Sequence, residues 1–193
     1  VPISYAGSIS NSVSITSGNL VSPDALSGAT YTYAGTGSTT YAASNIAPTA
    51  VGTYSITPSA ATLSTGTVSN YQITYAAGSL TISAASQSIT FGALSNKTYG
   101  DATFSVSASA SSSLTVVFTS ATTGVCTISS TTVTIVSAGT CTINANQAGD
   151  SNYSAANQVG QSFSVAPRPI TITAANVPIS YAGSISNSVS ITS

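Results

Sequence analysis

The chain has 193 residues, of which only 3% are charged, and its formal net charge is −1. Lys97 and Arg168 are its only cations, too few to neutralise a phosphate backbone, so we expect no nucleic-acid partner. Histidine is absent, and the acidic side chains are Asp24, Asp101 and Asp150 alone. We therefore expect no enzyme, no bound metal and no cofactor.

Apolar residues make up 42% of the chain and recur at patterned positions, which favours a folded protein over a disordered one. No run approaches the roughly 18 apolar residues that span a bilayer, so we expect no membrane span in this segment. No basic segment followed by an apolar one opens the chain. If the protein is exported, we expect its signal to lie outside these residues.

The chain carries a long internal repeat. Residues 1–17 read VPISYAGSISNSVSITS, and residues 177–193 repeat them letter for letter at an offset of 176. Self-similarity at a fixed offset is typical of repeat architectures. We therefore expect one full period of a longer array, followed by the first residues of the next copy.

A weaker repeat lies within the period. Ser-Asn-Tyr occurs at 69–71 and again at 151–153, and each occurrence precedes an alternating segment, at 79–83 and 162–166. A stiff Pro-Arg-Pro joint follows at 167–169, because proline fixes its own backbone and restricts the residue before it. We expect a first module at 1–85, a second at 86–168, and the start of the next copy at 169–193.

Taken in chain order, apolar residues alternate with serine or threonine in many short segments, which is the pattern of half-buried β-strands. Turn residues such as Ser-Gly and Ala-Gly separate them. This regular spacing predicts an all-β fold of tandem β-sandwich domains. A β-helix would need a short rung repeat, and the 15 glycines and 7 prolines disfavour an amyloid-like fibre. The expected strands include residues 13–15, 31–33, 54–56, 73–75, 79–83, 104–106, 125–128, 133–136, 162–166 and 170–174.

The chain begins at Val1, the counterpart of Val177, so no counterpart of residues 170–176 precedes the first module. We expect those residues to form the opening strand of that module. In an array, the preceding residues of the same chain would supply this strand. In the isolated chain, residues 170–176 of one molecule could complete the first module of the next, head to tail. The expected partners are therefore neighbouring repeats of the same chain or like chains.

Two sets of motifs carry a family resemblance. Those of the second module are Ser88–Phe91, Lys97–Asp101, Val125–Ile128, Ser137–Ile143 and Gln147–Tyr153, and those of the first are Val51–Ile56 and Asn70–Tyr75. The second module resembles the Ig-like repeats of large bacterial surface proteins, and the first resembles the related MBG type. Tyr5-Ala6-Gly7 departs from the Tyr-Gly-X pattern of that family. The resemblance covers nearly the whole chain and implies tandem Ig-like domains in the stalk of an extracellular adhesin or surface fibre, with no catalytic residue and no defined ligand.

Cys126 and Cys141 are the only cysteines, and both lie on expected strands. By the period-two rule Cys126 shares a face with Ile128 and Cys141 shares one with Ile143, so both thiols point into the core. A pair of buried free thiols is one interpretation, because cysteine packs as a small hydrophobic residue. An exported array favours a disulfide, which we expect to join neighbouring strands. Two cysteines without histidine do not make a zinc site.

Two classes of function remain. The first is a structural segment of an extracellular stalk, adhesin or filament that provides reach and mechanical continuity. The second is a carbohydrate- or host-protein-binding module that uses an exposed face of tyrosines, for which Tyr31, Tyr33 and Tyr41 are the candidates. The tyrosines of the two Asn-Tyr pairs, Tyr71 and Tyr153, are instead candidates for pinning loops to the sandwich.

Overall fold

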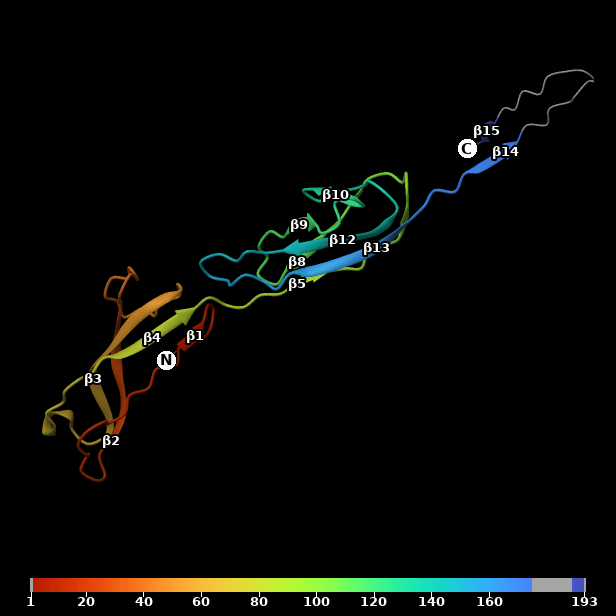
Figure 1. Ribbon diagram of the computed structural model, residues 1–193. Helices are drawn as coiled ribbons and strands as arrows, with labels where there is room; N and C mark the ends of the chain where they lie inside the picture. Colours follow the sequence, from red (N-terminus) through yellow and green to blue (C-terminus); the bar gives the residue numbers. More distant parts are fainter. Residues whose placement is uncertain (1, 175–188, 193) are drawn as a thin grey trace, which may run out of the picture. The chain divides into compact units, whose positions relative to one another are not determined.

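The structure is a computed structural model that describes residues 2–174 and 189–192 (Figure 1). Within these residues the chain folds into fifteen β-strands and one short 3₁₀ helix, η1 (Val68–Asn70). The expected all-β fold is therefore confirmed. The chain divides into two compact units, and the first break falls between Ser88 and Ile89, close to the expected module boundary. Unit 1 comprises residues 1–88 and 148–156, and unit 2 comprises residues 89–147 and 157–193.

Unit 1 is built on one four-stranded sheet with the order β1-β4-β3-β2. Figure 1 shows β4 between β1 and β3. The short β1 runs parallel to β4, whereas β4 with β3 and β3 with β2 are antiparallel. The strands are β1 (Pro2–Ser4), β2 (Ala25–Gly35), β3 (Gly52–Thr65) and β4 (Gly78–Ser83).

The core of unit 1 lies where three of its strands overlap. Of the residues in β3, only 52–56 pair with β4. β2, in contrast, pairs with β3 along nearly the whole length of β2. The side chains buried at this overlap are Tyr33, Tyr54, Leu80 and Ile82. Beyond the overlap, β2 and β3 continue as a two-stranded ribbon. That ribbon needs cover from other parts of unit 1, because an isolated hairpin buries too little apolar surface to be stable.

Unit 2 contains several sheets, as a β-sandwich requires. A four-stranded sheet has the order β6-β13-β12-β9, a three-stranded sheet has the order β10-β11-β7, and β5 pairs with β8. The strands are β5 (Ile89–Phe91), β6 (Lys97–Thr98), β7 (Phe104–Ser105), β8 (Ala108–Ala110), β9 (Val117–Ser120), β10 (Cys126–Ser129), β11 (Thr132–Ile135), β12 (Gly139–Asn146) and β13 (Val159–Ala166).

The longest hairpin of unit 2 shows why its sequence forms strands. Along β12 every second side chain is buried, and the residues between them are polar: Cys141, Ile143 and Ala145 face inward. The partner strand β13 buries Phe163 and Val165 in the same way. Successive side chains of a strand point to opposite faces, so this alternation gives one apolar face for the core and one polar face.

After β13 the chain forms β14 (Thr171–Ala174), which pairs antiparallel with β15 (Val189–Thr192). The strand expected at 170–174 is therefore present. Two other expected strands are not: residues 13–15 and 73–75 alternate as strands do, but neither belongs to a sheet in the described structure. The physical reason is that a strand needs a hydrogen-bonded neighbour, which alternation alone does not supply.

Candidate functional site: a groove in unit 1 and a disulfide in unit 2

Unit 1 contains an open pocket of about 600 Å³, which we call the unit-1 groove. One wall is the segment 13–20 and another is the segment 71–76. The floor is the part of the β2–β3 ribbon that extends beyond β4, and it contributes Leu26, Ala29, Pro58, Ala61 and Leu63. A cavity of this size is in the range that binds a drug-sized molecule or a short peptide.

The floor of the groove follows from strand register. Leu26 and Leu63 are direct partners across β2 and β3, so their side chains lie side by side on one face of the ribbon. Nearer the middle of the hairpin the pairing shifts, because Gly28 faces Thr62 whereas Thr30 faces Ser59. The extra residue in β3 makes a β-bulge, which frees a main-chain group from the ladder.

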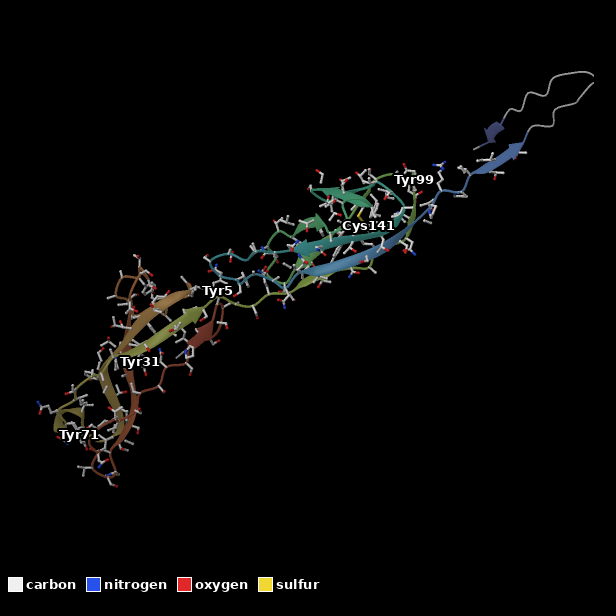
Figure 2. The ribbon with its side chains drawn as sticks, in the orientation of Figure 1. Tyr5, Tyr31, Tyr71, Tyr99 and Cys141 are labelled. Carbon is white, nitrogen blue, oxygen red and sulfur yellow. A yellow bond between two sulfur atoms is a disulfide. The ribbon has the colours of Figure 1, made fainter. Side chains whose placement is uncertain are left out.

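Two tyrosines hold the 71–76 wall in place. Tyr75 Oη accepts the Ala61 N–H at 2.9 Å, at the β-bulge. Tyr71 Oη accepts the Val21 N–H at 3.0 Å and donates to Asp24 Oδ2 at 2.7 Å. Figure 2 labels Tyr71 at the end of unit 1 opposite Tyr5. The pinning role considered for Tyr71 from the sequence is therefore seen in the structure.

The hydrogen bond that Tyr71 donates to Asp24 raises the pKa of the Tyr71 hydroxyl above its ordinary value, because the neutral phenol is the form that can donate. The Val21 N–H lowers this pKa, and desolvation and the Asp24 charge add smaller increases. This corner of unit 1 thus depends on a protonated tyrosine.

The groove presents apolar side chains that nothing in the described chain covers. Ile15 is 46% exposed, and Ile73 and Tyr75 are also exposed. None of the described residues that line the groove is charged. An exposed apolar concavity of this kind marks an interaction surface more often than a free surface.

The three tyrosines expected on an exposed face lie mostly inward. Tyr33 is only 4% exposed and is part of the unit 1 core, and its hydroxyl accepts a hydrogen bond from Asn11 Nδ2. Tyr31 and Tyr41 are partly buried against that core. Tyr41 also packs edge-on against Tyr54, with ring centroids 5.6 Å apart, and donates to the Ile46 carbonyl at 2.8 Å. Tyr33 is thus buried, whereas Tyr31 and Tyr41 are only partly buried.

Tyr153 has a loop-holding role of its own. Its ring packs edge-on against Tyr5 at 5.5 Å, and its backbone forms a β-bridge with Ala85. Asp150 supports the same loop by accepting the Asn152 and Tyr153 N–H groups at 2.8 and 2.9 Å. These contacts explain why residues 148–156 belong to unit 1 although they connect β12 to β13.

In unit 2, Cys126 and Cys141 form the expected disulfide, with Cα atoms 5.7 Å apart. Both side chains are fully buried (Figure 2 shows the yellow sulfur atoms at Cys141). One detail of the expectation is wrong, because the two cysteines do not lie on hydrogen-bonded neighbours. β10 belongs to the three-stranded sheet and β12 to the four-stranded sheet, so the disulfide connects the two sheets through the core.

The charged residues of unit 2 serve local structure. Asp101 Oδ2 accepts the Thr98 N–H at 2.9 Å in the turn that contains Gly100, whose φ of +93° suits glycine. Lys97 Nζ lies 4.8 Å from the centre of the Phe104 ring, a cation–π contact.

Among the residues that the structure describes, no three His, Cys, Asp or Glu side chains gather as a metal site would require. No helix in the same residues is long and apolar enough to span a membrane.

Comparison of the chain with protein-family models finds no match, and comparison with curated proteins finds none.

Proposed function

We propose that the chain is a structural segment of an extracellular surface stalk, adhesin or filament of the tandem Ig-like and MBG type. Its work is to give reach and mechanical continuity to an array of small β-domains. The observation that carries this proposal is the identity of residues 1–17 and 177–193, a stretch of 17 residues that recurs at an offset of 176.

The disulfide supports an extracellular location. Disulfides persist in oxidising compartments and are rare in the cytosol. Cys126 and Cys141 are fully buried and connect the two sheets, so the bond braces the interior of unit 2 and is shielded from other thiols. Such a brace suits a module that works under tension, because it prevents the enclosed loop from extending.

The roles of the acidic side chains support a structural function as well. Asp24, Asp101 and Asp150 each accept hydrogen bonds that hold a turn or loop. Each carboxylate is therefore used to shape the surface of a module.

A binding module is the second candidate, and the unit-1 groove is the observation that favours it. Its apolar walls and its tyrosines Tyr71 and Tyr75 would suit the flat face of a sugar or an extended peptide. A glycan array probed with the intact chain separates the candidates. Specific retention of one saccharide class favours the binding module, and no retention favours the stalk.

The stalk proposal is tested on cells of the source organism with antibodies raised against the 193-residue chain. We expect labelling of intact cells that external protease removes, and a reactive polypeptide much longer than 193 residues. Labelling that requires permeabilised cells would exclude the extracellular location.

A further inference from the structure

Two identical tetrapeptides of this chain are in different states. Residues 13–16 and 189–192 both read Val-Ser-Ile-Thr. Residues 189–192 form β15, which pairs with β14. Residues 13–16 belong to no sheet in the described structure and instead form part of one wall of the unit-1 groove. The same sequence therefore has a strand partner at one end of the chain and lacks one at the other.

We propose that the unit-1 groove is an acceptor site for a β-strand, and that its occupant is the segment 170–174, which contains β14 (Thr171–Ala174), of a second copy of this chain. This inference deepens the proposed function and rests on its premise that copies of the chain follow one another in an assembly. Each copy would insert its β14 beside residues 13–16 of the next, head to tail. A contact of this kind uses different surfaces on the two molecules and continues into an open filament unless the rotation closes.

The observed hairpin gives the register of the inserted strand. In the hairpin Thr171 faces Thr192 and Ile172 faces Ile191. Subtracting the repeat offset of 176 places Thr171 opposite Thr16 and Ile172 opposite Ile15. Thr173 and Ala174 then face Ser14 and Val13. Main-chain hydrogen bonds along this ladder would supply affinity, and the side chains on the groove side would supply specificity.

The donor segment has an apolar face without cover. Ile170 and Ile172 are 64% and 61% exposed. Because they are two residues apart, both would project from one face of an inserted strand that includes Ile170. The groove offers that face Leu26, Leu63 and Ile73. Insertion would thus remove apolar surface from water on both partners. In the hairpin of β14 and β15, by contrast, Ile170 and Ile172 remain exposed.

Exchange of partners costs little pairing energy. Because β15 and residues 13–16 have the same sequence, β14 loses one set of strand contacts and gains an equivalent set. The difference between the two states is the burial in the groove, set against the entropy of bringing two molecules together. In the isolated chain the exchange should therefore depend on concentration. In a covalent array β14 precedes the next copy's counterpart of residues 13–16 in the same chain, so the same pairing forms without exchange between molecules.

The charges also fit this occupant. Residues 170–174 carry no charged side chain, and none lines the groove. Binding should accordingly be insensitive to ionic strength, in contrast to binding of a charged partner.

The test uses a fluorescent peptide of residues 168–176 and the full 193-residue chain carrying Ile172→Asp, which disables its own donor strand. We expect saturable binding by fluorescence anisotropy, unchanged between low and high salt. A second change in the chain, Ile15→Asp, places a charge against the inserted strand and should weaken binding by about tenfold or more. Val136→Asp is the matched control, since Val136 is also 46% exposed but lies in unit 2, and it should leave binding within about twofold.

Equal binding to the Ile15→Asp and Val136→Asp chains, or no binding of the peptide at all, would overturn the acceptor site. Retention of a saccharide that Ile15→Asp abolishes, without peptide binding, would assign the groove to another ligand and equally overturn it. Circular dichroism of each variant confirms that the fold is retained. Light scattering of the unmodified chain should show oligomers that grow with concentration and that Ile172→Asp abolishes.

Failure of this test leaves the stalk proposal intact, because a covalent array needs no exchange of strands between molecules. Failure of surface labelling would remove the stalk proposal without changing the peptide binding measured in solution.

Discussion

The two units build similar sequence patterns into cores of different completeness. Among the residues that the structure describes, unit 2 buries twelve hydrophobic residues, including both half-cystines, and the disulfide joins its two larger sheets. Unit 1 has one four-stranded sheet and buries four hydrophobic residues, and the far half of its hairpin borders an open groove. An alternating sequence therefore permits a segment to form a strand. How completely the core is buried depends on how many of these segments pair with other strands.

This difference implies a division of labour. The closed unit 2 holds its shape by internal burial and by a covalent brace. In the assembly that we propose, the open unit 1 would carry the interaction surface, because a second chain can complete apolar walls that have no partner strand.

The largest expected effect on stability comes from truncating an isoleucine to alanine, once in the core of unit 2 and once at the groove of unit 1. Ile143 is fully buried in unit 2, so Ile143→Ala should lower the free energy of unfolding of that unit by about 2–5 kcal/mol. Ile73 is exposed at the groove, so Ile73→Ala should cost less than about 1 kcal/mol. Hydrogen exchange of peptides from each unit in increasing urea measures both values. Equal losses in the two units would contradict the contrast in core closure.

Reduction of the disulfide should affect unit 2 alone. The closed loop spans 15 residues, and in the chain-entropy view its closure contributes about 3 kcal/mol. Adding a reductant should therefore lower the unfolding midpoint of unit 2 while that of unit 1 stays unchanged. Intact mass after alkylation, with and without reduction, checks the bond itself. Two alkylated thiols in unreduced, unfolded protein would show that the bond is absent.

Tyr54→Phe probes the smaller core of unit 1. The Tyr54 hydroxyl donates to the Ala50 carbonyl at 2.6 Å, and phenylalanine keeps the ring but removes this bond. The expected loss is about 0.5–1.5 kcal/mol for one hydrogen bond, confined to unit 1. Thermal unfolding monitored by hydrogen exchange of both units measures it, and an equal change in unit 2 would contradict it.

The smallest expected effect is the change in folding stability with pH. From about pH 6 to 9 the stability should be nearly flat, because the chain has no histidine to titrate there. Above that range unit 1 should weaken. Burial, followed by the neighbouring Tyr41, raises the pKa of Tyr54, and the hydrogen bond to Asp24 raises the pKa of Tyr71.

The direction follows from proton linkage. A phenol with a raised pKa in the folded state keeps its proton longer there than in the unfolded chain. Its contribution to the free energy of unfolding is complete below the pKa of the unfolded chain, about 10. This contribution is lost as the pH rises through the higher pKa of the folded state. Urea midpoints between pH 8 and 11 measure the loss. Tyr71→Phe should make unit 1 less sensitive in this range, and an unchanged pH profile would contradict the role of that tyrosine.

Much of the fold could be predicted because it depends on local pattern. The alternation at 79–83 and 162–166 predicted β4 and β13, and the inward direction of Cys126 and Cys141 followed from the period of two. These features need only the chemistry of neighbouring residues along one strand. The disulfide could be predicted because the chain has only two cysteines and an exported array favours their oxidation over a pair of free thiols.

The tertiary structure decided which alternating segments became strands. Residues 13–16 have the same alternating sequence as residues 189–192, yet of the two only residues 189–192 have a partner strand in the described structure. It also decided that Tyr33 enters the core, that the disulfide spans two sheets, and that the far half of the β2–β3 ribbon borders a groove. The physical reason is that strand pairing and burial are contacts between residues distant along the chain. An alternating sequence predicts which face of a strand is apolar, but only the neighbouring elements in the folded protein determine what covers that face.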